Sequence, residues 1–385
     1  RPAAAAAEAA AAERVAPREL RVATTPAGGK RVRGTLDAAH GARLAYEVHG
    51  DGPNHAVVLH GGPGAGCFSR HAGFFGPEYT VVLLDQRGCG ASRPLGGLEH
   101  NTTEQLVEDL ELLRAHLDID SWLLFGGSWG TTLALAYASR HPSRVWGMIM
   151  RGVCLLRRSE IDWVFREGGA SALFPRQWDE FVGALPEDER TDPVAAYAAR
   201  MCSPDASAGV RAAAVRAWGR WSMAVYSGLP RGDERSSASW DGNKWNPGGG
   251  GAFVEPQQIV GGGDTPEALP ELSNVSGTVY SSGEAHALLE CWYCANQGFD
   301  LRAEPLLERV AAGALDGIPA IAVQGRSDLV TPPRTAWDLH RAWPEMQLRV
   351  VDGGHSMYSP RVMDGLCQAT DEMLRHAPRE VAGGL

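Results

Sequence analysis

The chain has 385 residues, of which 44% are apolar, and it carries a formal net charge of −10. This acidity argues against a nucleic-acid partner, because such a partner requires a basic protein face. The sequence contains no run of 18 apolar residues, so we expect no membrane-spanning helix and no membrane partner.

Seven cysteines, an odd number scattered along the chain, are not typical of a disulfide framework. Cys291 and Cys294 have the spacing of a metal or redox pair, but no second Cys or His pair accompanies them. We therefore predict no metal and no cofactor, and we expect a cytoplasmic protein. Residues 1–30 start with an alanine-rich stretch and are expected to be a frayed or disordered tail. The first residue is Arg1, so a removed leader stays an open alternative.

Seven apolar runs alternate with helical patterns and predict an α/β fold, a mostly parallel central sheet with helices on both faces. The predicted strands are 43–48, 56–59, 80–84, 122–125, 145–150, 318–323 and 347–351. After the third run, leucines at 106, 110, 113 and 117 share one face of a predicted helix. Thr102 and Gln105 offer that helix a capping box.

The predicted strand 56–59 ends in a glycine-rich turn with the sequence His60-Gly61-Gly62-Pro63-Gly64-Ala65-Gly66. Such a turn leaves backbone N–H groups uncovered, and acyl transfer needs donors where negative charge develops on the carbonyl oxygen. We assign this oxyanion hole to the N–H groups of Gly62 and Trp129. A phosphate-binding loop is the alternative, but the turn has neither a Gly-Lys-Ser/Thr ending nor a dinucleotide G-x-G-x-x-G pattern followed by a helix.

A tight turn, Gly126-Gly127-Ser128-Trp129-Gly130, stands between the predicted strand 122–125 and an apolar helical pattern. This order of strand, turn and helix exposes a serine hydroxyl as a nucleophile. Side chains at Gly126 and Gly130 would collide with the packed strand and helix, so the turn requires glycine there. The pattern predicts Ser128 as the catalytic nucleophile.

A serine nucleophile requires a base and a group that orients the base, and both candidates follow later strands. Asp328 comes directly after the predicted strand 318–323, and His355 comes after the strand 347–351. The order Ser128, Asp328, His355 is the order of α/β-hydrolases. Asp352 competes for the acid role, but it lies on the same loop as His355, and we prefer Asp328.

Four motifs carry a family resemblance: HGGPGAG from His60, DQRGCGAS from Asp85, GGSWGTTLAL from Gly126 and GRSD from Gly325. With them, the chain resembles the proline iminopeptidases, which are serine peptidases of the α/β-hydrolase fold that remove an amino-terminal proline from peptides. The resemblance covers roughly residues 35–155 and 285–375. It implies an inserted helical cap over the serine.

In that family, acidic residues of the cap hold the positively charged amino terminus of the substrate. The resemblance places one of them at Glu290, in the stretch Leu289-Glu290-Cys291-Trp292-Tyr293. The other family acid follows a tryptophan, and here Trp221 is followed by Ser222 instead. Two anions hold an ammonium better than one, so this departure bears on prolyl specificity. We include Gly61, Trp221, Ser222, Glu290 and Tyr293 as substrate-binding candidates.

Alternatives for the missing acid stay open, because Glu284, Asp233 or Glu234 could take its place. The last two belong to an insertion at 230–283 that is rich in Gly, Ser, Asn and Pro. We interpret this insertion as an elaborated lid over the active site, with a disordered surface loop as the alternative. Residues 155–314 as a whole show helical patterns with several tryptophans and mark the cap.

These patterns predict a tail at 1–30, a catalytic core at 31–154 and 315–385, and a helical cap at 155–314. The leading functional hypothesis is a serine hydrolase that releases an N-terminal proline or a similar residue through an acyl-enzyme. The second is an esterase, amidase or acyl-transfer enzyme with the same triad and a bulkier, natural-product-like substrate. The third is a non-catalytic ligand-binding relative, which the complete triad argues against. The oligomeric state is open.

Overall fold

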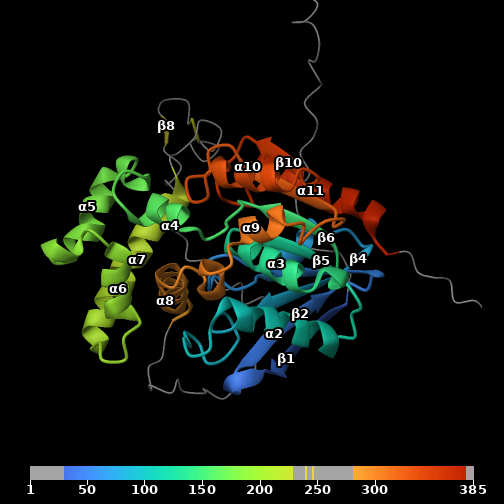
Figure 1. Cartoon of the computed structure of the whole chain (residues 1–385), viewed down its shortest axis with the longest axis horizontal. Coiled ribbons are helices and arrows are strands. Elements are labelled where there is room, and N and C mark those ends of the chain that lie inside the picture. The colour runs from blue at the N-terminus through green and yellow to red at the C-terminus, as the bar shows by residue number, and fades with distance from the viewer. Residues whose placement is uncertain (1–29, 229–238, 241–244, 247–280, 379–385) are drawn as a thin grey trace, which may run out of the picture.

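A computed structural model describes residues 30–228, 239–240, 245–246 and 281–378. Within these ranges an eight-stranded sheet has the order β1-β2-β4-β3-β5-β6-β9-β10 (Figure 1). β1 pairs with β2 and β2 with β4 in antiparallel fashion, and all other pairs are parallel. The strands are β1 (Arg31–Asp37), β2 (Arg43–His49), β3 (Asn54–Leu59), β4 (Tyr79–Asp85), β5 (Trp122–Gly127), β6 (Val145–Arg151), β9 (Ala320–Gly325) and β10 (Gln347–Val351).

Helices cover both faces of the sheet, which buries the central strands on two sides. One face is packed by α2 (Thr103–His116), α3 (Trp129–Arg140), α9 (Leu306–Ala311) and α10 (Pro333–Ala342), and the other by α11 (Pro360–Met373). Short 3-10 helices occupy Ala39–Gly41, Ser69–Phe74, Pro142–Arg144, Ala170–Ala172, Glu187–Glu189, Phe299–Arg302 and Leu374–His376. The predicted α/β class with a mostly parallel sheet is confirmed.

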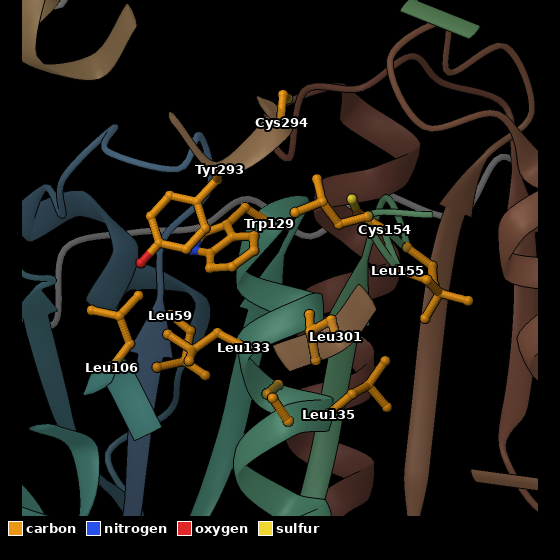
Figure 2. Packing of buried hydrophobic residues seen from close by; sticks show 14 of the residues in the cluster. Leu59, Leu106, Trp129, Leu133, Leu135, Cys154, Leu155, Tyr293, Cys294 and Leu301 are labelled. Atoms are coloured by element: carbon orange, nitrogen blue, oxygen red, sulfur yellow. The ribbon is translucent and has the colours of Figure 1, made fainter. Parts of the chain in front are cut away.

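The alternation of side chains along each central strand explains this double burial. On β5, Trp122 and Leu124 belong to the hydrophobic cluster of α2 and α3, whereas Leu123 and Phe125 belong to the cluster of α11. Successive side chains of a strand point to opposite faces, so a continuous apolar run is required when both faces are covered. Figure 2 shows part of the first cluster, in which Leu133 of α3 lies near Leu59 of β3.

Six α-helices of the described residues lie between β6 and β9 in sequence. One of them, α9, packs on the sheet, and we call the other five the inserted helices. They are α4 (Arg158–Phe165), α5 (Pro175–Gly183), α6 (Pro193–Met201), α7 (Ala208–Ser227) and α8 (Ser282–Ala295). α5, α6 and α7 gather on one side of the molecule, and α8 lies between them and the helices of the sheet (Figure 1). Their common core is aromatic: the Trp218 ring stacks on Phe165 at 4.2 Å, and Phe181 stacks on Tyr197 at 4.6 Å.

The predicted strands are confirmed within about two residues, and the structure adds β1, which the sequence analysis missed. The capping box at α2 is half correct. Thr102 accepts a hydrogen bond from the Gln105 N–H at 3.3 Å, but the Gln105 side chain turns to Asp109 instead of Thr102. The Gln105 side-chain N–H donates to this carboxylate one turn along, which directs the side chain away from the Thr102 N–H, so the reciprocal bond does not form.

The predicted tail and most of the 230–283 insertion lie outside the described residues, as do the candidate acids Asp233 and Glu234. Inside the insertion, β7 (Ser239–Trp240) pairs antiparallel with β8 (Trp245–Asn246). In the described part of the chain, none of the helices combines the length and apolar character needed to cross a bilayer.

Candidate active site

The turn after β5 holds Ser128 in a strained backbone conformation, with φ 56° and ψ −125°. A Cβ at Gly126 would collide with the carbonyl oxygen of Gly130, and a Cβ at Gly130 would collide with that of Leu59. Both glycines are therefore needed for the close approach of α3 to the sheet. The Ser128 N–H donates to the Arg151 carbonyl at 2.8 Å, which fixes the turn to the end of β6.

Asp328 and His355 meet at the same edge of the sheet because β9 and β10 are parallel and both end there. The His355 Nδ1 lies 2.8 Å from Asp328 Oδ2 and 2.9 Å from Oδ1. Asp328 also accepts hydrogen bonds from the N–H groups of Val330 and Thr331 and from the Thr331 hydroxyl, at 2.9 to 3.0 Å. The Gln324 side-chain amide also donates to Oδ2, at 3.5 Å. The carboxylate is thus held by five donors among the described residues and orients the imidazole.

Two opposing effects set the charge of Asp328. Burial raises its pKa, but the neighbouring His355, the Thr331 N–H and the charge of Arg151 together outweigh burial, so the net pKa lies below its usual value. Asp352, the competing acid, is solvent-exposed and lies 3.6 Å from the Arg326 guanidinium. The structure therefore pairs His355 with Asp328.

Ser128 and His355 are each hydrogen-bonded to Arg151, at the end of β6. The guanidinium of Arg151 donates to the His355 carbonyl at 2.7 Å, while the Arg151 carbonyl accepts from Ser128. At Gly152, a Cβ would lie 3.1 Å from both Asp328 Oδ2 and His355 Cε1. Among the described hydrogen bonds, none joins the Ser128 hydroxyl to His355. Catalytic hydrogen bonds of this kind often tighten only when substrate is bound.

The glycine-rich turn after β3 passes directly against the nucleophile. A Cβ at Gly61 would lie 3.1 Å from Ser128 Cβ and 3.7 Å from its Oγ. Gly62 has φ +111°, which only glycine adopts without strain, and its bond to Pro63 is cis. Trp129 is the first residue of α3, where a backbone N–H has no partner within the helix. Both candidate oxyanion donors are therefore next to Ser128.

A buried hydrogen-bond network ties these two donors together. His60 Nδ1 donates to the Gly61 carbonyl at 2.9 Å, and His60 Nε2 accepts from the Gln86 N–H at 3.1 Å. The Gln86 side-chain carbonyl accepts from the Trp129 indole N–H at 2.9 Å. Burial lowers the pKa of His60 to about 4, so the ring is neutral at neutral pH, as its acceptor role requires.

Glu290 of α8 and Ser222 of α7 are hydrogen-bonded to each other. The Ser222 hydroxyl and the Trp218 indole N–H both donate to Glu290 Oε2, each at 2.7 Å. No hydrogen bond within the described residues goes to Oε1. The two positions that the family resemblance pointed out thus face each other across the α7–α8 contact.

The remaining substrate-binding candidates differ in their surroundings. Trp221 is buried, and its indole N–H donates to the Val164 carbonyl. Tyr293 is also buried: its hydroxyl donates to the Asn101 side chain at 2.8 Å, and its ring lies against Trp129 (Figure 2). Both side chains are therefore packed inside the protein, with their polar atoms hydrogen-bonded there. Glu284, an alternative acid, accepts from the N–H and hydroxyl of Ser281 and caps the start of α8.

Three further residues around the site have no role predicted from the sequence. Arg151 could have been noticed as a charged residue that ends an apolar strand at the catalytic edge. Tyr226, near the end of α7, is 46% exposed, and its ring lies edge-on to His355 at 5.6 Å. His286 of α8 is close to Gly62, since a Cβ there would lie 3.1 Å from its Nε2. The positions of Tyr226 and His286 depend on how the helices pack, and no local sequence pattern indicates them.

Comparisons with known proteins place this site in a family. A model of the alpha/beta hydrolase fold matches residues 54–361. The chain is 40% identical over 344 residues to a proline iminopeptidase of Arabidopsis thaliana, which covers 88% of this chain and 79% of that protein. It is 38% identical over 343 residues to a proline iminopeptidase of Xylella fastidiosa, with coverage of 88% and 95%. The chain belongs to the proline iminopeptidase family.

The fold of this family member is also shared with distant solved structures. A bromoperoxidase from Bacillus anthracis superposes with a TM-score of 0.53 at 16% sequence identity, covering 90% of this chain and 100% of that one. Identity this low shows the fold alone. The family membership and the hydrolase fold together make the protein a hydrolase.

Proposed function

We propose that the protein releases an N-terminal proline or a similar small residue from peptides through a Ser128–His355–Asp328 triad. His355 takes the proton from Ser128 as its oxygen attacks the substrate carbonyl, and Asp328 holds the imidazole tautomer. The N–H groups of Gly62 and Trp129 stabilise the oxyanion. His355 then gives this proton to the amine of the departing peptide as the scissile bond breaks, and water hydrolyses the acyl ester left on Ser128. The observation that carries the proposal is the buried His355–Asp328 pair at the strand edge that also bears Ser128.

The substrate ammonium is proposed to bind at Glu290. Its Oε1 accepts no hydrogen bond from the described residues and would bind the cation, while Oε2 is held by Trp218 and Ser222. An ionised hydrogen bond in a sheltered site is stronger than one in water, so one fixed carboxylate suffices to select a free amino terminus. Gly61 lies against Ser128 and would border the bound residue. A peptide or another small amine is therefore the expected partner.

Ser222 also supports a second candidate function. Because it stands where the family resemblance places a second acid, the site carries less negative charge than two carboxylates would supply. An esterase, amidase or acyl-transfer activity on a bulkier substrate uses the same triad without an ammonium. Substrate charge is the property that separates the two candidates.

A substrate panel tests the two candidates. Prolyl-arylamide, alanyl-arylamide and aryl acetate are compared by kcat/KM, with Ser128→Ala as the blank. We expect the prolyl-arylamide to be the best arylamide substrate. Turnover of the ester alone would favour the second candidate, and binding without any turnover would favour a non-catalytic relative.

The same proposal divides the chain into a catalytic core and a cap. We take 31–154 and 315–385 as the catalytic core and 155–314 as a cap that selects the substrate, with 230–283 as part of the lid. The cytoplasm is the proposed location, supported by seven cysteines that are all free thiols. Cell fractionation with antibody detection tests the location.

A further inference from the structure

Arg151 is a buried cation that the proposed mechanism does not use. It is the last residue of β6 and is only 8% exposed. Its carbonyl holds the Ser128 N–H at 2.8 Å, and its Nη1 holds the His355 carbonyl at 2.7 Å. One residue therefore joins the nucleophile turn to the loop of the base, although these segments are more than 200 positions apart in sequence.

Gly127 provides the space that the guanidinium occupies. Gly127 is the register partner of Arg151 in the β5–β6 pair, and a Cβ at Gly127 would lie 2.7 Å from Arg151 Nη2. Gly127 lies in regular strand conformation, so its backbone does not require glycine. The second glycine of the turn is thus explained by the approach of Arg151, whereas Gly126 and Gly130 are explained by helix packing.

The charge of Arg151 is balanced by the triad acid. Burial lowers the pKa of Arg151, while Tyr226, Asp328 and Tyr358 act in the opposite direction. Arg151 in turn helps to keep the pKa of Asp328 low. Its Nε is buried and has no hydrogen-bond partner within the described residues. A buried cation without a direct ion pair is costly, so a functional reason for retaining it is expected.

We propose that Arg151 is a positioning residue that fixes His355 relative to Ser128 and supplies the positive charge that balances Asp328. The proposal rests on the proposed triad. With the cation in place, the pKa of Asp328 is lowered, so this carboxylate stays ionised to lower pH. The titratable groups that face this cluster are Asp328, Tyr226, Tyr358 and His71.

Arg151→Met and Arg151→Lys test the proposal through the pH dependence of prolyl-arylamide hydrolysis. In Arg151→Met we expect kcat to fall roughly 10- to 100-fold with little change in KM, because the base is misplaced while substrate binding is untouched. We also expect the acid limb of the kcat/KM profile to move to higher pH. Arg151→Lys keeps the charge, so the acid limb should return to its wild-type position.

Arg144→Met is the matched control, since Arg144 precedes the other end of β6 and pairs with Asp120 at the surface. It should leave both kcat and the acid limb unchanged. If Arg151→Met does not fold, as judged by circular dichroism, Gly127→Ala replaces it. That variant keeps the cation but displaces the guanidinium, so kcat should fall while the acid limb stays.

Three results would overturn the proposal. The first is a folded Arg151→Met enzyme with wild-type kcat and acid limb. The second is an Arg151→Met enzyme with a lower kcat but an unchanged acid limb of the kcat/KM profile. Arg151 would then have a structural role only. The third is a Gly127→Ala enzyme with wild-type kcat. Failure of the triad itself is distinguishable, because it would appear as turnover by Ser128→Ala.

Discussion

The carboxyl edge of the sheet and the inserted helices build their parts of the site in different ways. At the sheet edge, Ser128, Asp328 and His355 each follow a strand, so parallel pairing brings all three to the same edge. In the inserted helices, Glu290 acquires its surroundings from side chains of another helix, Trp218 and Ser222. Backbone structure therefore places the proposed catalytic residues at one edge, and side-chain packing places the group proposed to select the substrate.

The difference teaches where substitutions should act. A change at the sheet edge should affect every substrate, because all of them need the same nucleophile and base. A change around Glu290 should affect only substrates that carry a free amino group.

Ser128→Ala should abolish the chemistry for every substrate. We expect kcat/KM to fall by at least about 10³-fold for prolyl-arylamides and aryl esters alike, since the attacking oxygen is gone. Steady-state kinetics measure the loss, and an unchanged thermal unfolding midpoint shows that the fold is intact. Near-normal turnover of either substrate would remove Ser128 from the mechanism.

The neutral buried histidines of the sheet region should make the fold sensitive to acid. Burial lowers the pKa of His60 to about 4 and that of His71 to about 3. In the unfolded chain both histidines bind protons below about pH 6.5, the ordinary pKa of histidine. In the folded chain both stay neutral to lower pH. The free energy of unfolding should thus fall as pH drops from 7 to 5, by roughly 2 kcal/mol per histidine.

Urea unfolding at pH 7 and pH 5 measures this loss. His71 Nδ1 accepts from the Phe68 N–H at 3.2 Å, so His71→Asn offers an oxygen in its place without a titrating group. This variant should lose about half of the pH dependence. His100→Gln, a substitution of a half-exposed histidine, is the control. Equal stability of the wild type at both pH values would contradict the account.

The sheet edge could be predicted from sequence because its signals are local. The Gly-Gly-Ser-Trp-Gly turn, the strand before Asp328 and the strand before His355 are each contained in about ten residues. The antiparallel strand β1 was missed since only one of its seven residues is apolar and half-buried, and the rest are polar, small or exposed. β1 forms a strand through its antiparallel pairing with β2, and its own sequence carries no strand pattern.

The surroundings of the inserted helices could not be predicted in the same way. Trp221 and Tyr293 were candidates because they lie in the same short stretches as Ser222 and Glu290, yet nearness along a helix does not decide whether a side chain faces a site or the core. Both side chains are buried, with their polar atoms bound inside the protein. The contact between Ser222 and Glu290 depends on the packing of α7 on α8, which no local pattern encodes.

Ser222→Ala should give the smallest effect. It removes one of two hydrogen bonds to Glu290 Oε2 while the Trp218 bond remains. We expect KM for a prolyl-arylamide to rise about threefold with kcat unchanged, which corresponds to one modest hydrogen bond. Ser227→Ala, on the exposed end of the same helix, is the control. A large fall in kcat would contradict this role, because Ser222 would then act on the reacting atoms.

The most direct test of the separation between chemistry and selection is the preference for a free over an acetylated amino terminus. The ratio of kcat/KM for prolyl-arylamide to that for its N-acetyl derivative is measured in the wild type and in Glu290→Gln. We predict that the ratio falls roughly 10- to 100-fold in Glu290→Gln, because a charged hydrogen bond is lost. Turnover of an aryl ester should be unchanged. An unaltered ratio in a folded Glu290→Gln enzyme would contradict the account.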